Sequence, residues 1–157
     1  MTSIYIGVGS NLGDRKGQIV EAVLRMTQRG IRVRRASHLC KTDAVSRPGE
    51  TMPGFLNGVL EIETGLAPDR LLSELESVER ELGRNTKGDW APRTIDLDIL
   101  FYGDQVYESR RLKIPHPEIE RRRFVLEPMA ELNPGLVHPI LKRTMEELCN
   151  SLSTPRT

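Results

Sequence analysis

Residues 94–101, Thr-Ile-Asp-Leu-Asp-Ile-Leu-Phe, alternate apolar and acidic side chains in the second half of the chain. Successive side chains of a β-strand point to opposite faces of its sheet. The aliphatic side chains therefore share one face, and Asp96 and Asp98 point together to the other. Because aspartate is disfavoured within strands, two of them on one strand face indicate a function beyond strand formation.

The segments before this strand predict three more strands and two helices. Alternating apolar residues indicate strands over residues 3–9, 31–42 and 55–64. Apolar stripes at helical spacing indicate two helices, one that ends near Gly30 and one that ends at Gly83 in the left-handed conformation.

The resulting order, βαββαβ, predicts an α+β fold of the ferredoxin-like sandwich type. Two helices would cover one face of an antiparallel sheet, and the other face would stay open. A C-terminal extension follows, in which Thr144-x-x-Glu147 is a capping box that opens a last helix.

The composition is that of one globular domain over residues 1–157, with 38% hydrophobic and 29% charged residues. A formal net charge of +1 gives no overall field for nucleic acid or an anionic membrane. No apolar run approaches the roughly 20 residues of a membrane span, so we expect a cytoplasmic protein. A monomer is the default expectation for its oligomeric state. Cys40 and Cys149 lack metal-ligand or disulfide spacing, which favours reduced, buried thiols.

Asp96 and Asp98 are candidate ligands for a hard divalent cation. Magnesium binds one or two protein carboxylates and fills its remaining positions with water and phosphate oxygens. The segment before the aspartates adds cationic groups and the single tryptophan: Arg84, Lys87, Trp90 and Arg93. The three cationic side chains would neutralise the negative charge of a triphosphate. A loop that closes over the substrate would explain the presence of Trp90 in polar surroundings.

A second basic segment lies further along the chain. Residues 110–123 contain six Arg or Lys residues, Arg111 among them, against Glu118 and Glu120. His116 lies within it, held rigidly between Pro115 and Pro117. The near-neutral total charge therefore includes a local basic patch with a candidate nucleotide contact.

Residues 89–100, Asp-Trp-Ala-Pro-Arg-Thr-Ile-Asp-Leu-Asp-Ile-Leu, resemble the signature of the 6-hydroxymethyl-7,8-dihydropterin pyrophosphokinases. The resemblance continues at residues 5–13, 55–57, 115–117 and 122–126. It implies an enzyme of folate biosynthesis that transfers the β,γ-pyrophosphate of ATP to the hydroxymethyl group of the pterin. The implied cofactor is Mg²⁺, with two ions bridging the triphosphate.

The resemblance also implies roles for individual residues. Asp96 and Asp98 match the metal-binding carboxylates, and with Arg84 and Arg93 they form the expected catalytic set. The expected nucleotide-binding residues are Glu79, Arg84, Lys87, Trp90, Arg93, Ile99, Arg111, His116 and Arg122. The expected pterin-binding residues are Thr42, Val45, Phe55, Asn57, Trp90, Asp96 and Phe124, with Phe55 and Phe124 stacking on the two faces of the ring.

Two other classes of function stay open at this level. A four-stranded sheet with an open face also occurs in RNA-recognition domains and in small-molecule regulatory domains. RNA-recognition domains carry aromatic residues in an RNP1-like sequence, which this chain lacks. A non-catalytic binding module is therefore the alternative to the enzyme.

Overall fold

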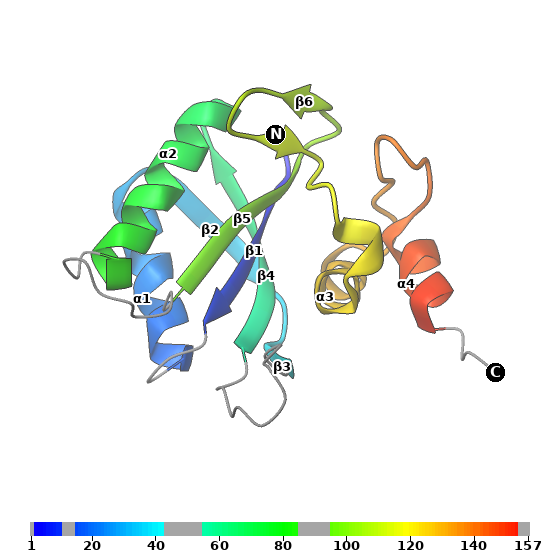
Figure 1. Ribbon diagram of the computed structural model, residues 1–157, viewed down its shortest axis with the longest axis horizontal. Coiled ribbons are helices and arrows are strands. Elements are labelled where there is room, and N and C mark those ends of the chain that lie inside the picture. The colour runs from blue at the N-terminus through cyan, green and yellow to red at the C-terminus, as the bar shows by residue number, and fades with distance from the viewer. Residues whose placement is uncertain (1, 11–14, 43–54, 85–94, 154–157) are drawn as a thin grey trace.

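The computed structural model describes residues 2–10, 15–42, 55–84 and 95–153 (Figure 1). Within these ranges the chain forms an α+β fold around one antiparallel sheet with the strand order β2-β4-β1-β5, and β3 pairs with β4 at one end. The predicted class is confirmed. The elements of this part are β1 (Ile4–Ser10), α1 (Arg15–Gln28), β2 (Ile31–Ala36), β3 (Cys40–Thr42), β4 (Phe55–Thr64), α2 (Pro68–Glu79) and β5 (Ile95–Tyr102).

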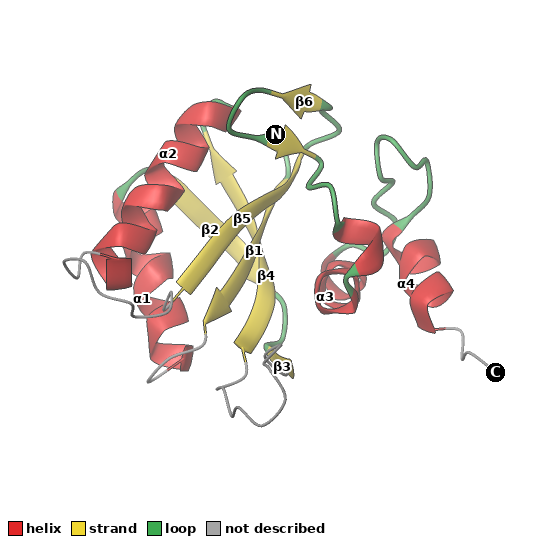
Figure 2. Cartoon of the chain, viewed as in Figure 1, coloured by secondary structure: helices red, strands yellow, loops and turns green. Residues whose placement is uncertain are grey.

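Helices α1 and α2 cover one face of the sheet, here called the α1–α2 face (Figure 2). Their apolar stripes point at the strands, and the central residue of the α2 stripe, Leu75, is fully buried. Buried apolar area of this kind is the main source of folding free energy. The strands contribute Ile6, Ile62 and the aliphatic side chains of β5 to the same core.

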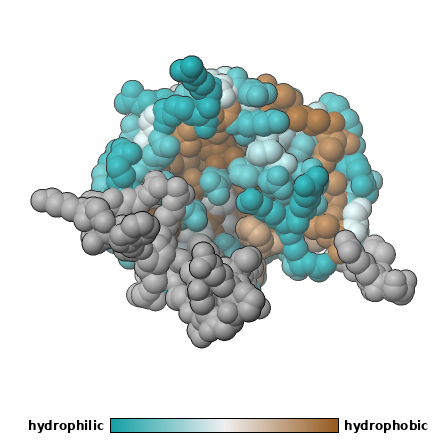
Figure 3. All heavy atoms as spheres, in the orientation of Figure 1, coloured by the Kyte–Doolittle hydropathy of each residue, from teal (hydrophilic) through white to brown (hydrophobic). Residues whose placement is uncertain are grey.

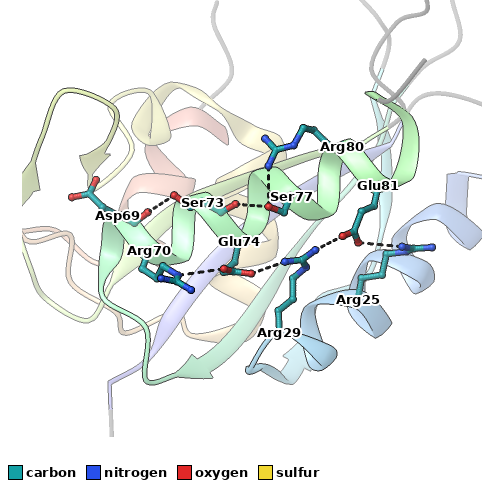
Figure 4. A network of polar contacts seen from close by, with 9 residues as sticks. All are labelled: Arg25, Arg29, Asp69, Arg70, Ser73, Glu74, Ser77, Arg80 and Glu81. Carbon is teal, nitrogen blue, oxygen red and sulfur yellow. Dashed lines mark hydrogen bonds and ion pairs between the residues drawn. The ribbon is translucent and has the colours of Figure 1, made fainter. Parts of the chain in front are cut away.

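Charged side chains join α1 and α2 on the outer surface (Figure 4). The Arg29 guanidinium donates to Glu74 at 2.7 Å and also to Glu81, and Arg25 donates to Glu81 at 3.1 Å. The hydrogen bond to Glu74 raises the pKa of Arg29. Because these groups are solvent-accessible, their ion pairs add little to the free energy of folding. They orient the two helices, and the apolar core beneath supplies most of the stability.

The end of α2 differs from the sequence-based prediction. A π-helical turn, η1 (Arg80–Arg84), follows α2, and Gly83 has φ 180°, which is extended rather than left-handed backbone. The predicted left-handed end at Gly83 is therefore wrong. The start of α2 agrees with the pattern, because Pro68 occupies the first turn of the helix, where its missing N–H costs no hydrogen bond.

The predicted strand over residues 31–42 is divided into β2 and β3. The two pieces flank Ser37, whose backbone N–H donates to Val59 O and whose hydroxyl accepts from Val59 N. The Ser37 side chain replaces a backbone partner at this point, so the regular ladder stops there. Both pieces still pair with β4.

The face opposite α1 and α2, here called the α3 face, is only partly open. Its covering elements are η2 (Ile119–Arg121), α3 (Arg123–Leu132) and α4 (Met145–Ser153). The hairpin of β6 (Tyr107–Glu108) and β7 (Lys113–Ile114) packs instead against the α1–α2 core through Tyr107 and Ile114. Figure 1 shows α3 and α4 on the opposite side of the sheet from α1 and α2. A second apolar cluster, which contains Tyr5, Phe101 and Met129, fills the interface. The prediction of a wholly open face is corrected, because the C-terminal extension covers one end of it.

Polar contacts attach α3 to the sheet at its C-terminal end. Arg35 donates to the buried Glu61 at 2.6 Å and to the backbone oxygen of Leu132 at 2.7 Å. Asn133 donates to the Tyr5 hydroxyl at 3.1 Å. A buried carboxylate is stable when it is paired in this way, so these contacts fix the position of α3 on the sheet.

The capping box of α4 is confirmed in both directions. Thr144 N donates to the Glu147 carboxylate at 2.8 Å, and Glu147 N donates to the Thr144 hydroxyl at 3.1 Å. Both cysteines are free thiols, but Cys40 is exposed, so its predicted burial is wrong. No described helix is long and apolar enough to cross a bilayer.

Substitution of Leu75 by alanine tests the α1–α2 core. We expect Leu75→Ala to lower the free energy of unfolding by about 2–5 kcal/mol, because the side chain is fully buried. Leu24→Ala on α1 is the control, since Leu24 is 53% exposed and its loss should change stability by less than about 0.5 kcal/mol. Urea unfolding measures both, and equal losses would contradict the assignment of the core.

Candidate functional site

Asp96 and Asp98 lie on the α3 face of β5, as the alternation predicts. Ile95, Leu97 and Ile99 are at most 3% exposed in the α1–α2 core, whereas Asp96 is half-buried and Asp98 is exposed. Side chains two residues apart on a strand are separated by about 6.6–6.8 Å. The two carboxylates therefore form a pair at the edge of the sheet.

Glycines occupy the strand beside this pair. In the β1–β5 register, Asp96 lies opposite Gly9 and Asp98 opposite Gly7. A glycine adds no side chain to the face, and at Gly7 the Leu100 side chain packs over the backbone, because a Cβ there would lie 3.4 Å from Leu100 Cδ2. Beyond Gly9, β4 places Asn57 in the same cross-strand row, and Asn57 is 8% exposed. With neighbouring strands about 4.8 Å apart, Asn57 and Asp96 are separated by roughly 10 Å.

The beginning of α3 borders this part of the sheet. The Arg122 guanidinium carbon lies 5.8 Å from the centre of the Phe124 ring, at a distance typical of a cation–π contact. Phe124 is half-buried against the second apolar cluster. In Figure 3, hydrophilic residues surround a recessed hydrophobic patch near the centre of the view.

His116 lies within electrostatic reach of both Asp98 and Arg122. Its backbone N–H donates to Leu100 O of β5 at 3.0 Å, and its ring Nδ1 accepts from Glu118 N at 3.3 Å. Burial lowers the pKa of His116 most, Asp98 opposes this shift, and Arg122 adds to it. The ring is therefore neutral near pH 7, with Nε2 carrying the proton as a donor.

Two of the expected nucleotide-binding residues contact α2 or the core. The Arg111 guanidinium donates to Ser73 at 3.2 Å and pairs with Glu76. Ile99 is 2% exposed in the α1–α2 core, so only its backbone is available to a ligand. The β6–β7 hairpin that precedes His116 is held by Asp69, which accepts from Tyr107 and Ser109. Its hydrogen bonds with Tyr107 and Ser109 lower the pKa of Asp69.

Glu79, the last residue of α2, is only 6% exposed. Its carboxylate accepts a hydrogen bond of 2.8 Å from the backbone N–H of Leu97. Leu97 lies between the two aspartates in the sequence, so Glu79 contacts the strand segment that carries them.

The structure does not describe every expected site residue. Val45, Lys87, Trp90 and Arg93 lie outside the described ranges. For Thr42, Phe55 and Arg84 only the backbone is described. In the β3–β4 register Thr42 lies opposite Phe55, which places these two expected pterin-binding positions side by side, and Asn57 lies opposite Cys40.

His116 lines a pocket that no sequence pattern predicts. His138 lines it from the connection between α3 and α4, together with Lys113, Pro115, Pro117, Glu120, Ile140 and Leu141. His138 Nδ1 accepts from Ile140 N and Leu141 N at 3.2 and 3.1 Å, and its ring meets the edge of Phe101 at 5.7 Å. Burial lowers the pKa of His138. The pocket brings residues 113–120 together with residues 138–141, and the ring contact joins His138 to Phe101. No spacing motif in the sequence marks this arrangement.

The donor set of the aspartate pair fits a hard cation. Among the described residues no group of three or more His, Cys, Asp and Glu side chains could hold a metal ion, so a closed transition-metal centre has no ligands in this part of the chain. Two carboxylates beside glycine backbone suit Mg²⁺, which takes its other ligands from water and phosphate.

Comparisons with known proteins agree with the geometry. Residues 5–134 match the family model of 7,8-dihydro-6-hydroxymethylpterin-pyrophosphokinase. The chain is similar to the 2-amino-4-hydroxy-6-hydroxymethyldihydropteridine pyrophosphokinase of Aquifex aeolicus, with 37% identity over 94% of this chain and 90% of the relative. It is 41% identical to the enzyme of the same name from Bacillus subtilis, over 82% of this chain and 76% of the relative.

Some similar proteins are longer. The Folic acid synthesis protein fol1 of Pneumocystis carinii is 42% identical, and the match spans 88% of this chain but 18% of that protein. The crystal structure of Plasmodium falciparum HPPK-DHPS wild type with pteroate has a TM-score of 0.74 and 15% identity, over 97% of this chain and 42% of that one. This structural likeness supports the fold alone.

Titration of His116 tests the proximity of the charged groups. We expect its pKa below the ordinary value of about 6.5, because burial disfavours the imidazolium. The histidine then reduces stability as the pH falls from that value through its folded-state pKa, since the unfolded chain binds the proton more readily. Asp98→Asn should lower the pKa further, and Arg122→Gln should raise it. Proton NMR of the ring measures each shift, and no change in either variant would refute this arrangement.

Proposed function

Because the chain belongs to the 7,8-dihydro-6-hydroxymethylpterin-pyrophosphokinase family, we propose that it transfers pyrophosphate from ATP to 6-hydroxymethyl-7,8-dihydropterin. It is an ATP-dependent pyrophosphokinase, and its products are AMP and the pterin diphosphate, an intermediate of folate biosynthesis. The observation that carries the location of the site is the pair Asp96 and Asp98 on the α3 face of β5, beside Gly7 and Gly9.

Asp96 and Asp98 would hold the metal. When bound, two Mg²⁺ ions would neutralise charge on the triphosphate. The two carboxylates lie on one strand whose other face is locked into the core, so their positions are set before any ligand arrives. Such preorganisation lowers the cost of ordering a charged substrate.

The phosphate groups would lie between the aspartates and the start of α3. His116 offers an uncharged Nε2–H donor and Arg122 a guanidinium, and the charges of Asp98 and Arg122 both act on the His116 ring. Arg84, Lys87 and Arg93 are proposed to add positive charge from the segment before β5, with Arg84 and Arg93 in the catalytic set. Donors placed where charge develops are the main source of catalysis in phosphoryl transfer.

The adenosine and the pterin would bind on either side of the phosphates. For the adenosine, Glu79, Arg111 and the backbone of Ile99 are the proposed contacts, and Trp90 is proposed to close the site. For the pterin, Phe55 and Phe124 would stack on the ring, and Thr42, Val45 and Asn57 would bind its polar edge. The position of Asn57 supports this role, because it lies in the same cross-strand row as Asp96.

The reaction is an in-line displacement at the β-phosphorus. The hydroxymethyl oxygen of the pterin forms a bond to that phosphorus as its proton is released, and the bond to the oxygen that bridges the α- and β-phosphates breaks. The electron pair of the broken bond leaves with AMP. The side chains contribute by alignment and charge compensation.

Further features of the protein are part of the proposal. The strand order β2-β4-β1-β5 supports a ferredoxin-like topology, in which β3 and the C-terminal elements are additions. We also propose one domain over residues 1–157, a monomer, and a cytoplasmic location.

Product analysis with aspartate variants tests the function. The wild-type protein should form AMP from ATP only when the hydroxymethyl pterin is added. Asp96→Ala and Asp98→Ala should each remove most turnover and leave the fold intact, because neither side chain lies in the α1–α2 core. Asp104→Ala is the control, since this exposed aspartate follows β5 outside the site. Near-normal turnover in either site variant would refute the metal assignment.

Loss of the Phe124 ring tests the pterin site. We expect Phe124→Ala to weaken pterin binding at least about tenfold, or 1.4 kcal/mol, and to change nucleotide binding much less, because one stacking face is removed. Phe124→Tyr keeps the ring and should keep the affinity. Isothermal calorimetry with each ligand measures the difference, and equal losses for both ligands would contradict the assignment.

A further inference from the structure

The outer edge of β5 is occupied by contacts from two other elements. β5 is the last strand of the sheet, so its backbone groups on the side away from β1 have no strand partner among the described residues. Two of these groups are satisfied in other ways: Leu97 N donates to the Glu79 carboxylate at 2.8 Å, and Leu100 O accepts from His116 N at 3.0 Å.

The Glu79 contact is important because of its position on β5. Leu97 is the residue between Asp96 and Asp98, so its amide belongs to the backbone that sets the spacing and direction of both carboxylates. Without a partner, the amides of an edge strand bond to water, and edge strands open more readily than central ones. The hydrogen bond that Leu97 N donates to the buried Glu79 side chain opposes that opening.

Glu79 is also fixed at its own end. It is the last residue of α2 and follows Val78, which is fully buried in the α1–α2 core. In addition to the apolar core that α2 and β5 share, the Glu79 side chain links the end of the helix directly to the backbone of β5. A carboxylate that is 6% exposed would be costly unless it accepted such hydrogen bonds, which explains a glutamate at this core-facing position.

We propose that Glu79 is a positioning residue, which holds the Asp96–Asp98 segment of β5 in the geometry that binds the metal–nucleotide complex. This role is additional to the adenosine contact proposed above, and it rests on the proposed function of the aspartate pair. It predicts that hydrogen-bond acceptance at residue 79, rather than its charge, sustains metal affinity.

The test compares Glu79→Gln and Glu79→Ala with Val78→Ala, a neighbouring core substitution that lowers stability without touching Leu97 N. Three quantities are measured on the full chain: amide exchange at Leu97 relative to Ile6 of β1, the Mg²⁺ concentration for half-maximal AMP formation, and the KM for ATP. Glu79→Ala should speed Leu97 exchange about tenfold and raise the half-saturating Mg²⁺ about fivefold, as the loss of one buried hydrogen bond implies. Glu79→Gln, whose amide oxygen still accepts, should stay within about twofold of wild type in both.

Three results would overturn the proposal. Unchanged Leu97 exchange in Glu79→Ala would show that the contact does not hold the strand. An unchanged half-saturating Mg²⁺ concentration in Glu79→Ala, with only the KM for ATP raised, would show that Glu79 acts on the nucleotide alone. The same changes in Val78→Ala would show general destabilisation. If the wild-type protein forms no AMP, the proposed function fails, whereas the Leu97 exchange measurement still reports on the contact itself.

Discussion

The alternation of side chains along β5 is the constraint on which the site depends. Ile95, Leu97 and Ile99 are buried against α1 and α2, and each such side chain contributes about 1.5–3 kcal/mol to folding. A shift of one residue would expose all three and place Asp96 and Asp98 in the apolar core, at a large cost for each unpaired charge. The hydrophobic core thus sets the register of the carboxylates, although it contains none of the catalytic groups.

The α3 face is divided between packing and chemistry. At one end Tyr5, Phe101 and Met129 form an apolar interface with the C-terminal helices, and towards the other Asp96 and Asp98 lie opposite the glycines of β1. The start of α3, with Arg122 and Phe124, lies at the boundary between these halves. Contacts that fix α3 on the sheet therefore also fix two groups of the proposed site.

Much of the fold was predictable because the strands and the first two helices carry clear periodic patterns. The division of β2 from β3 was not, since it depends on a hydrogen bond between Ser37 and Val59 that no local pattern encodes. Helix α3 begins at Arg123 with no side-chain cap and contains Pro128, so it lacks the usual start and interior signals of a helix. Within the site, alternation predicted the aspartate pair, whereas the hydrogen bond from Leu97 to Glu79 and the pocket beside His138 arise from contacts distant in the chain.

The occupied outer edge of β5 has a consequence for association between chains. An open sheet edge is a template on which a strand of another molecule can add. On β5, the bonds at Leu97 N and Leu100 O remove donor and acceptor sites that such a strand would need. On the opposite edge, β2 carries Arg32, Arg34 and Arg35, which pair with Glu63 and Glu61 of β4. A strand added at β5 would have to displace these intramolecular hydrogen bonds, and one added at β2 would meet a row of charged side chains.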